Sequence, residues 1–176
     1  YEKIRYIRKT ATTKLNKDEI KILIDEIIRQ GCLPMATPFD EKSVDLLDSL
    51  GVEIIKIASC SFTDWPLLEK VVAKKKPIIA STAGATEQQI DKVVTFFKNR
   101  NKDFALMHCV AEYPTPNNKL NLNRLKFLKE KYKINVGYSD HTLGIEACIA
   151  ATALGAEIIE KHFTINKNYS NFRDHA

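Results

Sequence analysis

Short apolar runs and helical patterns alternate along this chain, and that alternation restricts its fold more than any other feature. Six runs have the length and composition of buried strands: 33–37, 53–58, 77–81, 104–109, 134–138 and 157–162. Helical spacing of apolar residues fills the intervals, at 41–49, 65–74, 86–100, 121–131 and 144–154. Because a helix between two strands returns the chain to the same end of the sheet, all six strands should be parallel. The sequence therefore predicts an α/β fold.

Two helix starts carry a capping box, in which a polar cap and the residue three positions later satisfy each other's backbone groups. Asn16 is followed by Glu19, and Thr86 is followed by Gln89. After Asn16, isoleucine and leucine recur on one side of a helix that should end near Gly31. The spacing predicts an apolar face on this helix that needs to be covered.

The predicted strands are nearly continuous in apolar character, as expected where helices cover a parallel sheet. Their regular repeat favours a TIM (β/α)₈ barrel, and an open doubly wound sheet is the alternative. No GxGxxG or GxxxxGK[ST] pattern follows any strand. The sequence therefore gives no support for a Rossmann or P-loop site.

The composition is that of a globular domain with one sizeable core, because 44% of the 176 residues are hydrophobic and 28% are charged. No apolar run approaches the roughly 20 residues that span a bilayer, and residues 1–10 lack the apolar stretch of a secretory signal. We therefore expect a cytoplasmic protein with no membrane partner. Four separated cysteines should be buried reduced thiols: Cys32, Cys60, Cys109 and Cys148.

The formal net charge of +5 suits an anionic ligand. Lysine and arginine are spread over the predicted helices, and no basic run exceeds the three lysines at 74–76. Because no aromatic residues are interleaved with these lysines, nucleic acid is not an expected partner.

Polar or small residues follow most of the predicted strands, at 37–40, 59–61, 81–84, 112–116 and 139–142. The last strand carries its own polar pair, Lys161 and His162. In a parallel barrel the loops after the strands build the active site, so the chemistry should collect on that face. Hydroxyl groups and glycine there let the backbone N–H groups approach a phosphate closely.

Lys56 lies inside an otherwise apolar predicted strand, where a lysine is costly unless it is paired. We expect it to bind an anionic ligand. The alternative is that its aliphatic stem reaches the rim of the sheet beside an acid such as Glu53 or Asp40.

His141 and His162 each lie at the end of a predicted strand, and the two strands are consecutive. If these strands are neighbours, both imidazoles lie at one end of the sheet and can ligate one cation, with Mn²⁺, Fe²⁺, Co²⁺ or Zn²⁺ better suited than Mg²⁺. Hydrogen-bonded rim histidines are the alternative, and the spacing does not decide between the two. His108 and Trp65 are interpreted as packing residues without a catalytic role.

Seven segments resemble the N-acetylneuraminate (sialic acid) synthase family, which includes legionaminic and pseudaminic acid synthases, in the family's order and at its spacing. They are ATPFD (36–40), KIAS (56–59), PIIASTAG (77–84), HCVAEYPTP (108–116), GYSDHTLG (137–144), GAEIIEKHFT (155–164) and RDHA (173–176). TPFD, SDHT and KHFT together are specific to the family. The resemblance implies a TIM barrel in which residues 1–176 supply strands three to eight as one partial synthase domain.

The resemblance further implies an enzyme that condenses phosphoenolpyruvate with an N-acetylated amino sugar such as N-acetylmannosamine. C3 of phosphoenolpyruvate attacks the sugar aldehyde, water adds at C2, and phosphate leaves by C–O cleavage to give a nine-carbon 2-keto sugar acid. In the family a divalent metal, usually Mn²⁺, polarises the aldehyde oxygen and is held by the histidines that match His141 and His162.

The family's phosphoenolpyruvate contacts match Thr37, Lys56, Ser59, Ser81 and Ser139. Tyr113 of the YPTP motif is implied on the sugar side, and Asp174 is implied to orient water or substrate after the last strand. With Lys56, these two residues are the catalytic candidates.

Two positions depart from the family pattern. Ser61 stands where many members carry a carboxylate, and Ala111 stands where the family has an asparagine. A barrel that binds phosphoenolpyruvate, sugar or metal without turnover is therefore an alternative. A related phosphoenolpyruvate aldol-type synthase with a different sugar is another.

The family barrel begins with two βα units that no segment of this chain resembles, and it often ends in an antifreeze-like domain that is likewise unmatched. A barrel without two of its strands would expose two sheet edges and much of its core. We therefore expect residues 1–176 to belong to a longer protein, which the resemblance implies is a homodimer.

Overall fold

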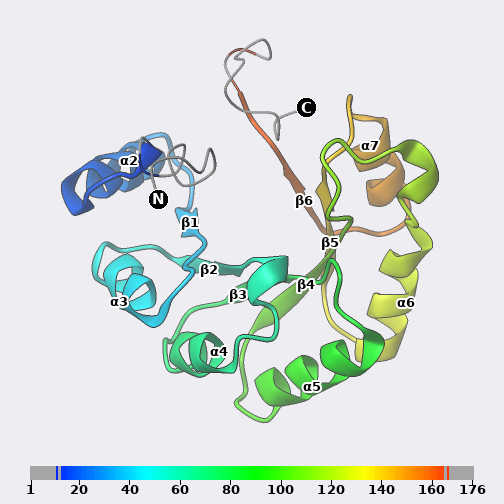
Figure 1. Ribbon diagram of the computed structural model, residues 1–176, viewed down its shortest axis with the longest axis horizontal. Helices are drawn as coiled ribbons and strands as arrows, with labels where there is room; N and C mark the ends of the chain where they lie inside the picture. The colour runs from blue at the N-terminus through cyan, green and yellow to red at the C-terminus, as the bar shows by residue number, and fades with distance from the viewer. Residues whose placement is uncertain (1–10, 12, 165, 167–176) are drawn as a thin grey trace.

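The computed structural model describes residues 11, 13–164 and 166. Its six strands form one parallel sheet in sequence order: β1 (Met35–Ala36), β2 (Ile54–Ile57), β3 (Ile78–Ser81), β4 (Phe104–Cys109), β5 (Val136–Asp140) and β6 (Ile158–Lys161). The sheet curls into an arc with its helices along the outer side (Figure 1). The predicted α/β class and barrel-type architecture are confirmed. The open doubly wound alternative is wrong, because helices would then cover both faces of the sheet.

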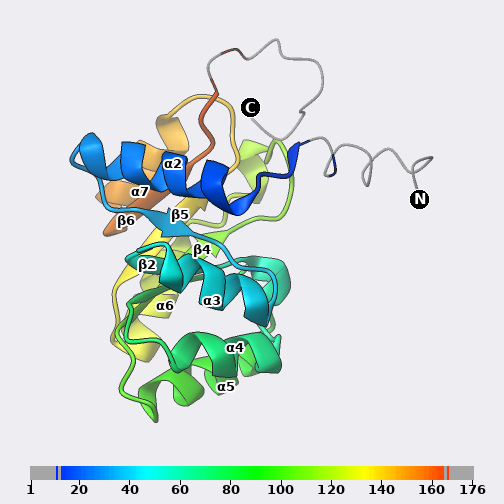
Figure 2. The ribbon, with the colours of Figure 1, turned by 90° about the vertical axis from the view of Figure 1, so that its left-hand side faces the viewer.

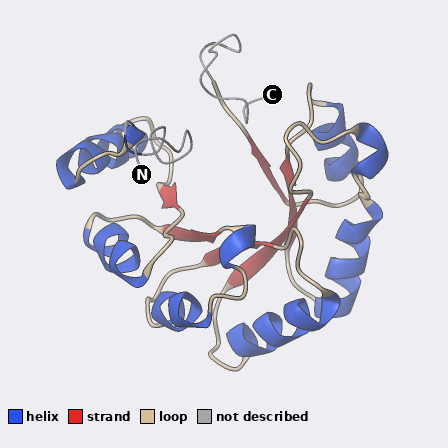
Figure 3. Cartoon of the chain, in the orientation of Figure 1, coloured by secondary structure: helices blue, strands red, loops and turns tan. Residues whose placement is uncertain are grey.

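A helix follows each of the first five strands and returns the chain to the start of the next (Figure 3). These helices are α3 (Glu41–Ser49), α4 (Trp65–Val72), α5 (Glu87–Lys98), α6 (Asn123–Tyr132) and α7 (Glu146–Ala153), and α2 (Lys17–Arg29) precedes β1. Short 3-10 turns occur at η1 (Ser59–Ser61) and η2 (Asn117–Lys119). In the part of the chain that the structure describes, no helix has the length and apolar character needed to cross a membrane.

Both predicted capping boxes are present, at Asn16 with Glu19 and at Thr86 with Gln89. The main core lies between the arc and the outer helices, where Ile57, Leu106 and Phe97 are completely buried. A smaller cluster holds α2 against α3, with Ile24 as the buried residue that α2 contributes. Figure 1 shows α2 beside β1 at one end of the arc, and Figure 2 shows α2 from the side, above α3.

The boundary of β5 differs from the prediction, which placed the loop directly after Tyr138. Ser139 and Asp140 belong to the strand, because they continue its pairing with Glu160 and Lys161 of β6. Polar side chains therefore lie on both faces of the last strand pair, where the sequence had indicated a loop.

The cysteine prediction is partly wrong. All four cysteines are free thiols, but only Cys109 is buried, whereas Cys148 is half-buried and Cys32 and Cys60 are exposed. Cys32 lies in the exposed segment after α2, which ends at Arg29, and Cys60 is an exposed residue of η1.

Gly137 lies where β5 and β6 leave no room for a side chain. A Cβ atom added there would lie 2.6 Å from the carbonyl oxygen of Ile158, a backbone atom that cannot move without shifting β6. We expect Gly137→Ala to lower the free energy of unfolding by about 1–3 kcal/mol, the usual cost of overpacking. Urea denaturation followed by circular dichroism measures this, and an unchanged midpoint would contradict the close packing of these strands.

Candidate active site

The inner face of the arc carries a buried ion pair. Lys56 of β2 is 7% exposed, and its Nζ donates to Oε1 of Glu160 in β6 at 2.9 Å. Three strands separate β2 from β6 in the sheet, so this contact must cross the concave side. The alternative pairing of Lys56 with Glu53 or Asp40 is therefore wrong. Both acids are exposed, and Asp40 instead caps α3 by accepting from the Ser43 N–H.

Ser139 joins this ion pair from β5. Its hydroxyl donates to Oε1 of Glu160 at 2.7 Å. Burial alone would raise the pKa of Glu160, but the hydrogen bonds from Lys56 and Ser139 outweigh it and hold the pKa below its ordinary value. Glu160 is therefore an anion within hydrogen-bonding distance of a buried cation.

The remaining predicted hydroxyl residues lie in different surroundings. Ser81, at the end of β3, is 3% exposed, and its Oγ has no hydrogen-bond partner among the described residues. Ser59 accepts a hydrogen bond from the Ala83 N–H at 3.1 Å, and Thr37 is half-buried just after β1. A buried hydroxyl without a partner costs about 1–3 kcal/mol, so Ser81 has the most to gain from a bound ligand.

His141 and His162 directly follow β5 and β6, and their ring centroids are 5.4 Å apart. His141 Nδ1 lies 2.7 Å from the carbonyl oxygen of Val110. Because a carbonyl can only accept, Nδ1 carries the proton and the lone pair of Nε2 is left for another partner. The pKa of His141 lies below its ordinary value, chiefly because the ring is buried. The electrostatic influence of His162 lowers this pKa further, whereas the hydrogen bond to Val110 raises it by less. The neutral ring that a cation requires is thus favoured.

The two rings fit a divalent cation of the imidazole-binding type. Within the described residues, no group of three histidine, cysteine or acidic side chains gathers that could hold a metal ion. A cation bound by these two rings would therefore keep coordination positions open for substrate oxygen or water. The predicted Asp174 lies outside the described residues.

The loop after β4 packs against both histidines. The ring of Tyr113 lies 4.0 Å from that of His141 and 5.7 Å from that of His162, measured between centroids. The backbone N–H of Thr115 in the same loop donates to the His141 carbonyl at 2.8 Å. The structure thus brings the predicted Tyr113 and the predicted histidine pair together.

His108 and Trp65 have the packing roles that the sequence indicated. His108 is buried, with Nε2 2.8 Å from the Leu120 carbonyl, and burial lowers its pKa. Trp65 makes an edge-to-face contact with Phe96 at 5.4 Å between centroids.

Two carboxylates near the predicted residues, Glu160 and Asp140, were not predicted from the sequence as part of the site. The side chain of Asp140 is 0% exposed and lies 2.6 Å from Lys161 Nζ. Burial alone would raise the pKa of Asp140, but the hydrogen bonds from Lys161, Thr142 and Cys148 lower it to about 2. Because a buried lysine needs a partner, Lys56 indicated that a carboxylate lies near it in the fold. The sequence alone did not show which of the 22 acidic residues this is.

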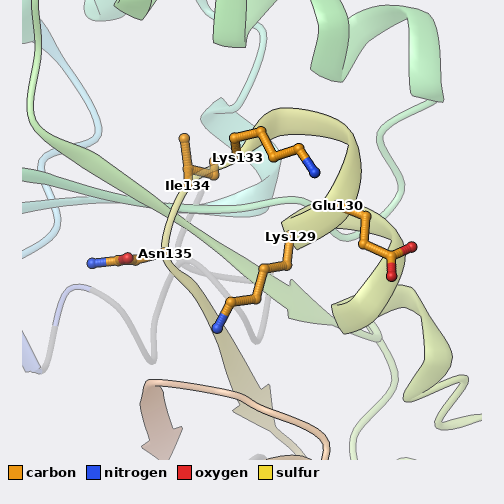
Figure 4. A pocket seen from close by; sticks show the side chains of 5 residues that line it. All are labelled: Lys129, Glu130, Lys133, Ile134 and Asn135. Atoms are coloured by element: carbon orange, nitrogen blue, oxygen red, sulfur yellow. The ribbon is translucent and has the colours of Figure 1, made fainter.

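Two of the hollows in the described part of the chain lie at opposite ends of the parallel strands. One of about 480 Å³ lies before β5 and is lined by Lys129, Glu130, Lys133, Ile134 and Asn135 (Figure 4). A smaller one of about 130 Å³ lies after β2 and β3, where Ser59, Ala83 and Gln89 are among its lining residues. Barrel sites form after the strands, so the smaller hollow belongs with the candidate site and the larger one does not.

A curled parallel sheet with a buried lysine–glutamate pair inside it, and with two histidines at its strand ends, defines a barrel site suited to an anionic substrate and a divalent cation. The model of the NeuB family matches residues 2–176. The chain belongs to the NeuB family.

Two of the relatives that this chain resembles are named as synthases of N,N'-diacetyllegionaminic acid and of pseudaminic acid. N,N'-diacetyllegionaminic acid synthase of Campylobacter jejuni is 47% identical over 139 residues, which is 77% of this chain and 42% of that protein. Pseudaminic acid synthase of the same species is 38% identical over 140 residues, 79% of this chain and 41% of that protein. The crystal structure of the sialic acid synthetase of Leptospira borgpetersenii, in complex with citrate, matches with a TM-score of 0.94 and 36% identity.

That structure is matched over 99% of this chain and 62% of its own length. The chain spans about half the length, or less, of these curated relatives. It covers 52% of a Methanocaldococcus jannaschii relative and 41–42% of the two synthases.

The lowered pKa of Glu160 predicts a pH-dependent stability. The ionised carboxylate stabilises the fold above its unfolded pKa of about 4.3, and this contribution is lost as the pH falls through the lower folded value. We expect Glu160→Gln to reduce the free energy of unfolding by about 1–3 kcal/mol near neutral pH, and the difference to shrink below about pH 4. Urea denaturation in EDTA at a series of pH values measures it.

Glu157→Gln is the matched control, because Glu157 forms an ion pair with Lys129 just before β6 but is 42% exposed. Its loss should change stability by less than about 1 kcal/mol at any pH. A pH-independent deficit in Glu160→Gln would contradict the assignment of Glu160 as a stabilising anion.

Proposed function

We propose that the protein to which this chain belongs condenses phosphoenolpyruvate with an N-acetylated amino sugar of the N-acetylmannosamine type. The product would be a nine-carbon 2-keto sugar acid, and phosphate would be released. One observation carries the proposal: a buried Lys56–Glu160–Ser139 cluster occupies the inner face of the arc, and His141 and His162 stand at the ends of the strands that carry Ser139 and Glu160.

Phosphoenolpyruvate is strongly anionic, and the hydroxyl and cationic groups of the inner face suit it. Lys56 Nζ has three N–H donors, so it can bind phosphate or carboxylate oxygen while it remains beside Glu160. Ser81 offers a buried hydroxyl without a partner among the described residues. Thr37 and Ser59, which follow β1 and β2, extend the same set of groups.

Glu160 gives the site a negative charge next to this anion-binding group. Ser61, where many family members carry a carboxylate, is buried in η1. In our proposal Glu160 supplies the anion that stabilises positive charge developing at C2 of phosphoenolpyruvate. Lys56 and Ser139 hold its carboxylate in place through their two hydrogen bonds.

His141 and His162 would hold the divalent cation, which the resemblance to the family implies is Mn²⁺. When bound, such an ion supplies Lewis-acid polarisation of the sugar aldehyde. Residues of this chain orient the two rings. His141 is held by its hydrogen bond to the Val110 carbonyl, and the Tyr113 ring lies beside both histidines. Tyr113 is 50% exposed and can contact the sugar from this position.

Phosphate release by the full-length protein tests the function. With Mn²⁺, phosphoenolpyruvate and a panel of N-acetylated hexosamines, we expect release that depends on one or a few of the sugars. His141→Ala should abolish it. Absence of release with every sugar, in a protein that still binds Mn²⁺ and phosphoenolpyruvate, would instead favour a non-catalytic binding barrel.

Lys56→Ala tests the phosphoenolpyruvate site. Loss of the buried ammonium should raise the KM for phosphoenolpyruvate at least tenfold, on the order of a charge-assisted hydrogen bond of about 1.5–3 kcal/mol. Steady-state phosphate release measures this value. Lys126→Ala is the control, because the Lys126 side chain is 73% exposed on α6. An unchanged KM in Lys56→Ala would remove Lys56 from the site.

A further inference from the structure

Asp140 carries a fully buried carboxylate that takes no part in the proposed chemistry. Successive residues of a strand point to opposite faces, so Asp140 faces away from Ser139 and toward the outer helices. Its oxygens accept hydrogen bonds from Lys161 Nζ at 2.6 Å, the Thr142 N–H at 2.9 Å, the Thr142 and Tyr138 hydroxyls at 3.1 Å and the Cys148 thiol at 3.2 Å. A carboxylate with so many donors is fixed in position.

Lys161 connects this carboxylate to the next strand. The β5–β6 register sets Asp140 directly beside Lys161, and Lys161 Nζ also donates to the Thr142 carbonyl at 2.9 Å. Each partner immediately precedes one of the two histidines. The ion pair is therefore the last fixed contact between the strands before the chain enters His141 and His162.

The two histidines differ in their other supports. His141 is held by the Val110 carbonyl through its ring and by the Thr115 N–H through its backbone. His162 is exposed, it follows β6 at one end of the described sheet, and the next residue, Phe163, is 87% exposed. Within the described part of the chain, its side chain makes no hydrogen bond and has ring contacts with Tyr113 and His141.

Because the Asp140–Lys161 ion pair lies directly before both histidines, we propose that it positions His162 against His141, so that both rings meet one cation. The proposal rests on the cation site of the proposed function. Both residues are positioning residues, because neither touches the substrate groups on the inner face. A ligand whose support is lost must be ordered on binding, and loss of such support typically weakens metal affinity by about 10–100-fold.

Lys161→Met tests this in the full-length protein. It keeps the aliphatic stem and removes the ammonium, while Asp140 retains the donors from Tyr138, Thr142 and Cys148. We expect the Kd for Mn²⁺, measured by the electron paramagnetic resonance of the free ion, to rise about tenfold or more. The Kd for phosphoenolpyruvate, measured by calorimetry in EDTA, should change less than about twofold because its proposed site is on the opposite face.

Two further variants separate positioning from stability. Replacing both partners, as Asp140→Asn with Lys161→Met, leaves no uncompensated buried charge and should restore much of the thermal stability lost in either single variant. It should not restore the Kd for Mn²⁺. Lys129→Met removes the Lys129–Glu157 ion pair just before β6 and should leave the Kd for Mn²⁺ unchanged.

An unchanged Kd for Mn²⁺ in Lys161→Met would overturn the proposal, and so would a parallel loss of Mn²⁺ and phosphoenolpyruvate binding. Failure of the proposed function would look different, because Mn²⁺ binding would then be insensitive to His141→Ala. A measurement without metal tests the positioning of His162 even if the two rings bind no Mn²⁺. In EDTA, the ring ¹⁵N signals of His162 should shift or broaden in Lys161→Met but not in Lys129→Met. Identical His162 spectra in both variants would also overturn the proposal.

Discussion

The charge pair across the concave side of the sheet is the contact on which the candidate site depends. Lys56 and Glu160 come from strands at opposite parts of the arc, so they can meet only because the sheet curls. A lysine buried in a strand is tolerated when a carboxylate is within hydrogen-bonding distance. The curl therefore creates both the barrel interior and the polar cluster inside it.

The last strand pair carries different polar residues on its two faces. Ser139 and Glu160 are register partners on the inner face, whereas Asp140 and Lys161 are register partners on the outer face. In our proposal the first pair provides charge and hydroxyl groups for a ligand, whereas the second pair joins the two strand ends through an ion pair. One step along each strand changes the role of a side chain, because successive residues point in opposite directions.

Much of the fold followed from pattern. The strand order and its parallel direction were predictable because the helices between the strands permit little else, and Asn16 and Thr86 cap their helices as expected. The proximity of His141 and His162 was predicted only for the case in which the two strands that precede them are neighbours in the sheet. For Lys56, the alternative of a partner such as Glu53 or Asp40 was wrong, because those acids are near it in the sequence and Glu160 lies 104 positions away.

The sequence by itself determined the element order, the helix caps and the collection of polar groups after parallel strands, because these depend on local periodicity and chain direction. Tertiary structure alone decided that Glu160 neutralises Lys56, that Asp140 pairs with Lys161, and that the Val110 carbonyl leaves Nε2 of His141 available. These contacts join residues far apart in the chain. The curvature of the sheet and the register between its strands bring these residues together. Local patterns of residues predict neither the curvature nor the register.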